Sequence, residues 1–403
     1  MKLILKYIYL LFLTSIMYGC IETFEYETKV FESALVVEAS ISNEFKLQKI
    51  KLSRTHKLKE ETNINTETGA TVEVTDDQGN TFSFNELSPG EYTSNSPFAA
   101  VQNRSYRLMI TTSDNKSYSS NNQQIKSLSP LQKVTAKAIT TNDGGIKKEG
   151  ISIIAESYDA SRNSNFYRYE YEETYKIVAP FWSSQETEII LRTFPFKVGL
   201  TNKTKEDRNC YKTEKSEHII LTETATLSED RVNFSVNFLE KSDFKITNRY
   251  SILVKQHIQS REAYTFYKIL NNLSSSESLF SQMQPGTLIG NIVSNDNVNE
   301  NVLGFFEITS VSSKRIFFNY SDFYQGELPE YIEKCEVIAP TLRRPKDIES
   351  SPLIEILDKG KYIYYMDNPK TETHLKGPYL LVSKACGNCT ELSSNIKPNF
   401  WVD

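Results

Sequence analysis

Apolar and polar residues alternate over short stretches of the first third of the chain, a pattern typical of β-strands with one buried face. Thr71-Val72-Glu73-Val74-Thr75 runs into the turn-forming segment Asp76-Asp77-Gln78-Gly79-Asn80, and Thr81-Phe82-Ser83-Phe84 follows as a hairpin partner. The other predicted strands are residues 35–41, 48–53, 90–92, 106–110 and 117–119. This spacing predicts an N-terminal immunoglobulin-like or transthyretin-like β-sandwich over residues 34–127.

The rest of the chain, residues 128–403, is predicted to form a larger β-rich domain, so the fold class is mainly β. The segment from Ser127 to Leu131, which contains Pro130, marks the expected boundary. The strands predicted in this domain are residues 134–139, 151–155, 166–177, 189–196, 218–221, 250–257, 288–292, 303–311, 314–318 and 362–365.

One helix is expected in this domain, near residues 261–273. Ser260 is a favourable N-cap residue and Glu262 lies in the first turn, where an acid is favoured. Four apolar residues recur at helical spacing, which predicts that the helix packs against the sheet through them: Ala263, Phe266, Tyr267 and Leu270.

Three tyrosines alternate along the strand predicted at 166–177. Tyr167, Tyr169 and Tyr171 fall on one face, and Arg168 and Glu170 fall on the other. Exposed, the tyrosines could stack on sugar rings or on a partner; buried, they are part of the sheet core, which is the interpretation we favour.

The N-terminus has the pattern of a lipoprotein signal. Lys2 and Lys6 precede an apolar stretch that is too short to span a bilayer, and the stretch ends at Gly19-Cys20. This resembles the lipobox of bacterial lipoproteins, so we expect a signal peptide over residues 1–19, cleavage after Gly19, and a diacylglyceryl group on Cys20. An ordinary signal peptide, or a buried N-terminal helix with an incidental cysteine, are the alternatives.

Residues 20–33 are then a lipidated tether. The acidic residues Glu22, Glu25 and Glu27 loosely match a surface-export signal, or they belong to a solvated linker. No later apolar run is long enough for a membrane helix, so the lipid is the expected contact with the outer membrane. With 46 basic and 51 acidic residues and a net charge of −5, the chain lacks the basic excess typical of nucleic-acid binding.

Four cysteines remain after Cys20: Cys210, Cys335, Cys386 and Cys389. An even number in an exported chain favours two disulfides, and three pairings are open. Cys386-Gly-Asn-Cys389 also has the spacing of a redox or zinc motif. Disulfides that fasten the C-terminal tail to the middle of the chain are the favoured interpretation.

No constellation of catalytic residues stands out. The four histidines form no metal-binding pair, and the chain contains neither a Gly-x-Ser-x-Gly motif nor a phosphate-binding loop. Residues 295–301 offer alternating oxygen side chains for calcium, but the segment lacks the central glycine and a polar turn is favoured. We therefore expect no enzyme activity, no cofactor and no metal, with a hydrolase that uses an unrecognised pair of acids as a remote alternative.

Several segments together resemble one family of Bacteroidota lipoproteins, the domain of unknown function 4249. The segments that carry this resemblance are residues 35–38, 50–55, 69–76, 250–256, 262–264, 290–292, 302–306, 386–389 and 397–401. The resemblance implies an outer-membrane lipoprotein, often encoded near TonB-dependent receptors, with no assigned activity and no catalytic residues. Ala39 departs from the glycine expected there, and residues 340–380 match poorly.

These observations predict a non-enzymatic outer-membrane lipoprotein that assists a TonB-dependent receptor in nutrient capture. Tethering by a lipid would raise the concentration of the protein beside such a partner. The alternative is a surface adhesin or an envelope-assembly factor that uses exposed strands.

Overall fold

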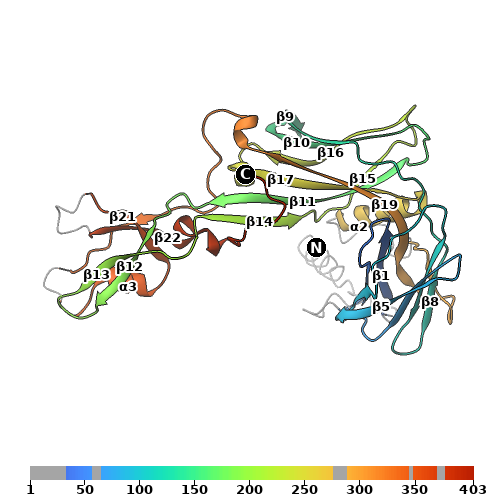
Figure 1. Ribbon diagram of the computed structural model, residues 1–403, viewed down its shortest axis with the longest axis horizontal. Helices are drawn as coiled ribbons and strands as arrows, with labels where there is room; N and C mark the ends of the chain where they lie inside the picture. The colour runs from blue at the N-terminus through green and yellow to red at the C-terminus, as the bar shows by residue number, and fades with distance from the viewer. Residues whose placement is uncertain (1–32, 57–64, 276–287, 345–347, 370–376) are drawn as a thin grey trace, which may run out of the picture.

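The computed structural model describes residues 33–56, 65–275, 288–344, 348–369 and 377–403 (Figure 1). The fold is mainly β, as predicted. The predicted signal peptide, nearly all of the tether and Cys20 lie outside the described residues, so these features stay predictions.

The N-terminal unit is built on one continuous sheet whose strands follow the order β19-β1-β2-β6-β5-β4-β7-β8-β18, with β3 paired to β2. Inward-facing residues of these strands, such as Val37, Ile50 and Val74, form one apolar core. The strands from the first part of the chain are β1 (Leu35–Ser42), β2 (Lys49–Arg54), β3 (Asn65–Thr66), β4 (Thr71–Asp76), β5 (Thr81–Ser88), β6 (Glu91–Ser94), β7 (Tyr106–Thr111) and β8 (Ser117–Ser120).

Two strands from much later in the chain complete this unit. β18 (Ile292–Ser294) pairs with β8, and the first part of β19 (Val302–Phe318) runs parallel to β1, with Leu35 opposite Val302 and Ser42 opposite Thr309. The limits predicted for the two domains, residues 34–127 and 128–403, stay predictions. The pairing nevertheless shows that the sandwich receives strands from beyond residue 127.

The strand β19 belongs to both halves of the molecule. Beyond Thr309 it pairs antiparallel with β17 (Tyr250–Ile258), from Ser310 opposite Ile258 to Phe318 opposite Tyr250. Residues 303–311 and 314–318, predicted as two strands, are therefore parts of one 17-residue strand. Since one strand crosses the junction without a break, a continuous β-ladder joins the two units.

The second unit packs two sheets against each other. The β14-β11-β17-β19 portion of the long sheet, with β15 paired to β11, faces the three-stranded sheet β16-β10-β9, and their facing side chains form a second core. Tyr167 and Tyr169 are almost fully buried in this core, which confirms the preferred interpretation of the tyrosine ladder; Tyr171 is partly buried. The strands are β9 (Lys133–Asp143), β10 (Ile146–Asp159), β11 (Phe166–Val178), β14 (Asn209–Lys215), β15 (Ile220–Glu223) and β16 (Asp230–Glu240).

A narrow arm projects from this second unit (Figure 1). It contains the hairpin β12 (Gln185–Leu191) and β13 (Lys197–Asn202) and a small sheet of β20 (Val337–Ile338), β22 (Tyr379–Ser383) and β21 (Tyr362–Asp367). Two short helices accompany them, α3 (Pro352–Asp358) and α4 (Lys384–Gly387). The core of the arm is small and centres on Leu353, Tyr364 and Leu381.

The predicted helix is present as α2 (Arg261–Ser275), and the hydroxyl of Ser260 accepts a hydrogen bond from the N–H of Ala263 at 3.1 Å, as an N-cap residue does. The helix packs through Ala263 and Phe266 against Phe305 of β19. The strand predicted at 288–292 is wrong in extent, because β18 begins only at Ile292. Before that point the side chain of Asn291, rather than a strand, bonds to the backbone of β19.

Candidate functional site

A cleft of about 830 Å³ lies where the two units meet, between the outer face of β1 and the helix α2. One wall is formed by β1, whose residues Val36, Glu38 and Ser40 point away from the sandwich core. The neighbouring strand β19 continues this wall, and the helix α2 forms the opposite one. The apolar residues that line the cleft are Val36, Val37, Ala39, Ile219, Phe266, Leu270, Leu288, Leu303, Phe305 and Val311.

One wall requires glycine at position 304. The φ angle of Gly304 is +137°, and a Cβ atom there would lie 2.1 Å from the carbonyl oxygen of Val37 on β1. Any larger residue would therefore push β1 and β19 apart beside the cleft. This contact accounts for the glycine in the segment Leu303-Gly304-Phe305.

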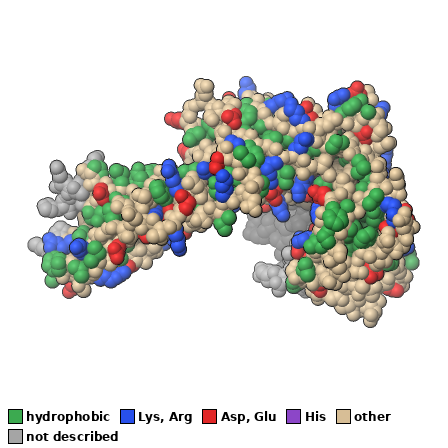
Figure 2. Space-filling model, in the orientation of Figure 1, with side chains coloured by type: hydrophobic (Ala, Val, Ile, Leu, Met, Phe, Trp, Pro, Cys, Tyr) green, Lys and Arg blue, Asp and Glu red, His purple; other side chains and the backbone are tan. Residues whose placement is uncertain are grey.

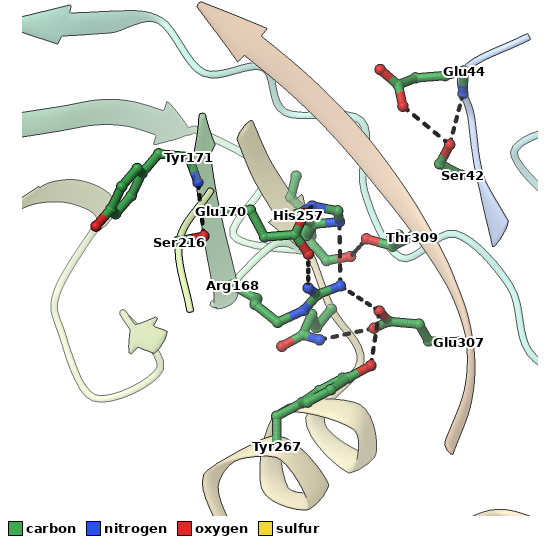
Figure 3. A network of polar contacts seen from close by, with 12 residues as sticks. Ser42, Glu44, Arg168, Glu170, Tyr171, Ser216, His257, Tyr267, Glu307 and Thr309 are labelled. Carbon is green, nitrogen blue, oxygen red and sulfur yellow. Dashed lines mark hydrogen bonds and ion pairs between the residues drawn. The ribbon is translucent and has the colours of Figure 1, made fainter. Parts of the chain in front are cut away.

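Arg168 lies at the floor of the cleft, at the centre of a buried polar network (Figure 3). It is 8 % exposed, and its Nη2 donates to Oε1 of Glu307 on β19 at 2.6 Å. Its Nη1 donates to Glu170 on β11. The second oxygen of Glu307 accepts a bond from Gln259 at 2.8 Å, so one carboxylate connects β11 and β19 with the residue that follows β17.

Burial, the largest single effect, would raise the pKa of Glu307, but the Arg168 guanidinium, His257 and the hydrogen bond from Gln259 together outweigh it, and the pKa lies below its usual value. The pKa of Arg168 is raised: burial, the largest single effect, would lower it, and Glu307, Tyr267 and Glu170 together more than offset that. Both groups are therefore ionised at neutral pH, as a salt bridge that joins the two units.

His257 completes the floor beside this pair. Its Nδ1 faces Nη2 of Arg168 at 3.5 Å, and its Nε2 lies 3.5 Å from the carboxylate of Glu170. Burial and the charge of Arg168 lower the pKa of His257, so the ring is neutral at neutral pH. Contacts with His257 and Arg168 hold the pKa of Glu170 well below its usual value.

Three polar atoms of this network have no hydrogen-bond partner among the described residues. They are Nε of Arg168, which is a donor, Nε2 of His257, and Oε1 of Gln259, which is an acceptor. Buried polar groups are nearly always satisfied in folded proteins, so these atoms are places where a buried water molecule would bind.

The predicted cysteine site is present as two disulfides, Cys210–Cys389 and Cys335–Cys386. Cys386 and Cys389 therefore each bond to a different distant partner, and the Cys-x-x-Cys spacing is part of a structural cross-link. The first disulfide joins β14 to the C-terminal segment, which confirms that the tail is fastened to the middle of the chain.

The segment considered for calcium is used as a polar turn. The carboxylate of Asp296 accepts a bond from the N–H of Ser117 at 2.6 Å, and Glu300 accepts one from the hydroxyl of Tyr118 at 2.8 Å. These carboxylates fasten the turn to β8. In the described ranges, no group of three or more His, Cys, Asp or Glu side chains is arranged to hold a metal ion.

Alternation placed Arg168 and Glu170 together on one face of their strand, but it gave no indication that Glu307 and His257 would join them. Nor did it indicate Tyr267, whose hydroxyl donates to Oε1 of Glu307 at 3.4 Å. Each of these lies on a different element, and Glu307 is 139 residues from Arg168. The sequence signal that was available is weak: a glutamate at position 307 interrupts a strongly apolar stretch of β19.

The fold and the cleft define a mainly β protein in which two units share one strand and enclose an apolar cleft with a charged floor. The family model described as Domain of unknown function (DUF4249) matches residues 21–315, well over half of the chain. The protein belongs to this family. The match ends within β19, so the C-terminal cysteine and tryptophan segments that also suggested the family lie beyond the matched range.

No curated protein and no solved structure matches the chain. Of the helices in the described ranges, none combines the length and the apolar character needed to cross a membrane.

Proposed function

We propose that this protein is a non-enzymatic, lipid-anchored binding protein of the outer membrane, which captures a nutrient beside a TonB-dependent receptor. The cleft between β1 and α2 is the observation that carries the proposal. Ligand sites in proteins are concave, mostly apolar, about 300–1,000 Å³ in volume, and carry a few fixed polar groups. The cleft of about 830 Å³, with its apolar walls and the Arg168 network at its floor, has each of these properties.

The lipid anchor expected on Cys20 supports the receptor part of the proposal. The first described strand, β1, forms a wall of the cleft, and the tether leads directly into it. A lipid at Cys20 would therefore keep the cleft within a short length of chain from the membrane. Confinement to a membrane surface raises the effective concentration of a bound ligand next to a membrane partner.

The experiment that tests this function is purification of the membrane-extracted protein through a C-terminal tag, since Val402 near the C-terminus is exposed. A single TonB-dependent receptor recovered in stoichiometric amount is the expected result. Recovery of the protein alone, under detergent conditions that keep such receptors folded, would contradict it. A Cys20→Ala variant is the control: it should lose lipid-dependent membrane retention, and with it most of the receptor.

A second candidate function rests on the arm. Hydrophobic side chains gather on the end of the arm that carries β12 and β13 (Figure 2), where Ile190, Leu191 and Phe194 are each about half exposed. Exposed apolar groups on a projecting element are typical of protein contact sites. This favours adhesion or envelope assembly as the alternative. It would be supported if Phe194→Ser altered attachment or envelope integrity and left nutrient uptake unchanged.

A further inference from the structure

The turn at the outer end of the arm exposes apolar side chains in close succession. It consists of residues 192–196, which connect β12 to β13 (Figure 1). Ile190, Leu191 and Phe194 are each about half exposed. The register of β12 with β13 shifts between Ile189 and Leu191, which interrupts the alternation of faces. Two consecutive apolar residues are therefore exposed together, directly before the turn.

The fold holds this turn in place. Phe196, the last residue of the turn, is only 8 % exposed, and its ring meets the ring of Phe194 edge to face at 6.4 Å. On the other side of the turn, Nη1 of Arg192 donates to both carboxylate oxygens of Asp358, at 3.0 and 2.8 Å. These contacts fix the backbone, so the neighbouring apolar side chains are presented to the surroundings of the protein.

Two cations flank the exposed apolar residues. The guanidinium of Arg343 stands over the ring of Phe194 at 5.8 Å, and Lys197 lies opposite Leu191 in the register of the hairpin. Both are exposed, and neither forms an ion pair with a carboxylate of the described residues. The nearest acid along β12 is Glu188, about 10 Å behind Leu191. The end of the arm therefore combines apolar side chains with positive charge that the protein itself does not neutralise.

This combination fits a lipid surface better than a protein surface. A stable protein interface buries about 800 Å² on each partner and uses about 20–30 residues a side, and lysine is depleted in such interfaces. The exposed turn is much smaller, and it projects from a narrow arm (Figure 2). A bilayer needs no matching shape: it takes up apolar and aromatic side chains at its boundary, and its anionic head groups attract lysine and arginine.

We infer that the end of the arm inserts into an anionic phospholipid surface. Ile190, Leu191 and Phe194 would lie below the head groups, with Lys197 and Arg343 at the phosphates. This contact goes beyond the proposed binding function, because it gives the protein a second attachment to the membrane besides the expected lipid. Two attachments, at the tether and at the arm, would fix the orientation of the body on the membrane.

The inference is tested with Phe194→Trp in the full-length protein, reconstituted into vesicles whose acyl chains carry bromine, which quenches tryptophan at close range. The vesicles contain phosphatidylcholine with about one third phosphatidylglycerol. Leu87→Trp is the matched control, at a position on β5 that is 72 % exposed, and the unaltered protein with its two tryptophans gives the background. We expect bromine to quench the added fluorescence of Phe194→Trp at least threefold more than that of Leu87→Trp.

The role of the charges is tested in the Phe194→Trp protein. Vesicles of phosphatidylcholine alone should quench at most half as much as the anionic vesicles. Lys197→Glu combined with Arg343→Glu should reduce quenching at least threefold. Lys133→Glu combined with Lys137→Glu makes the same change of charge at exposed positions on β9, and it should leave quenching unchanged.

Three results would overturn the inference. They are quenching of Phe194→Trp no stronger than that of Leu87→Trp, equal quenching with and without phosphatidylglycerol, and an emission of Phe194→Trp that shifts only when a partner protein is added. The last result would assign the end of the arm to a protein contact. Flotation of the vesicles reports the lipid anchor separately: if the protein floats and its fluorescence is not quenched, the arm contact is wrong and the anchor stands.

Discussion

The side-chain amide of Asn291 forms two hydrogen bonds with the backbone of Phe306. Its Nδ2 donates to the carbonyl oxygen and its Oδ1 accepts from the N–H, each at 2.8 Å. These are the two bonds that a residue of a neighbouring strand would form. One side chain therefore extends the ladder of β19 immediately before β18 begins, and it connects the last strand of the sandwich to the strand shared by both units.

Replacement of Asn291 by alanine should lower the free energy of unfolding by about 1–3 kcal/mol, because a buried donor and acceptor on β19 lose their partner. Urea denaturation followed by circular dichroism measures this change. Asn122→Ala is the matched control: Asn122 is exposed, and its replacement should change stability by less than about 0.5 kcal/mol. Equal effects of the two substitutions would show that the Asn291 bonds contribute nothing.

Replacement of Glu307 should lower the free energy of unfolding more than most other single substitutions where the two units meet. Glu307→Ala leaves the Arg168 guanidinium buried without its main counter-charge, which costs about 3–5 kcal/mol. The exposed pair Arg231 and Glu229, 3.0 Å apart, provides the comparison, and Glu229→Ala should cost under about 1 kcal/mol. The shift in urea midpoint of each variant measures the difference, and comparable midpoints would refute the structural role assigned to Glu307.

Peptide mapping without reduction should recover Cys210 linked to Cys389 and Cys335 linked to Cys386, with no Cys386–Cys389 peptide. The first disulfide joins residues 179 positions apart and the second joins residues 51 apart. A disulfide that closes a longer loop removes more entropy from the unfolded chain. By this account the Cys210–Cys389 disulfide stabilises the folded protein by about 1 kcal/mol more than the Cys335–Cys386 disulfide does. Serine replacement of each pair, followed by thermal unfolding, should therefore show a larger loss for the Cys210–Cys389 pair.

Asp159, at the end of β10, should make the protein sensitive to acid. Burial would raise its pKa, but hydrogen bonds from Ser161, Ser164 and Ser127 outweigh burial and lower the pKa to about 2. A depressed carboxyl pKa stabilises the folded state above the unfolded-state pKa, near 4, and this contribution is lost as the pH falls towards 2.

The stability difference between the unaltered protein and Asp159→Asn should therefore shrink by about 2 kcal/mol between pH 5 and pH 2. Urea titrations at a series of pH values measure it. A difference that stays constant over this range would show that the carboxylate of Asp159 has the same pKa in the folded and unfolded chain.

The elements that could be predicted from the sequence are those whose signal is local. The alternation of residues 35–41 corresponds to β1, and the cap and apolar face of residues 260–270 correspond to α2. The strand β16 was missed although Val232, Phe234 and Val236 alternate along it, so the signal was present. β14 was missed because Asn209–Lys215 is polar, and its place depends on pairing with β11.

The site could be predicted only in part, for a different reason. The period of a strand places Arg168 and Glu170 on one face, but β19 is brought beside them by the pairing of β11 with β17 and of β17 with β19. No pattern within a short window encodes these pairings, since strands so distant in sequence are matched only by the complete fold. The cleft depends in addition on the parallel pairing of β1 with residues 302–309 and was equally beyond prediction.

The central position of β1 also determines how the protein would respond to mechanical force. β1 pairs with β19 from Leu35 to Ser42 on one side, and with β2 from Leu35 to Ala39 on the other. An anchor at Cys20 would pull on its first residues. A pull along the axis of such a strand loads its transverse hydrogen bonds together in shear, whereas a pull across an edge strand opens them one at a time. Because β19 continues into the second unit, the load would pass directly to both halves of the molecule. The strand that forms a wall of the cleft is thus also placed to resist unfolding under a pull applied through an anchor at Cys20.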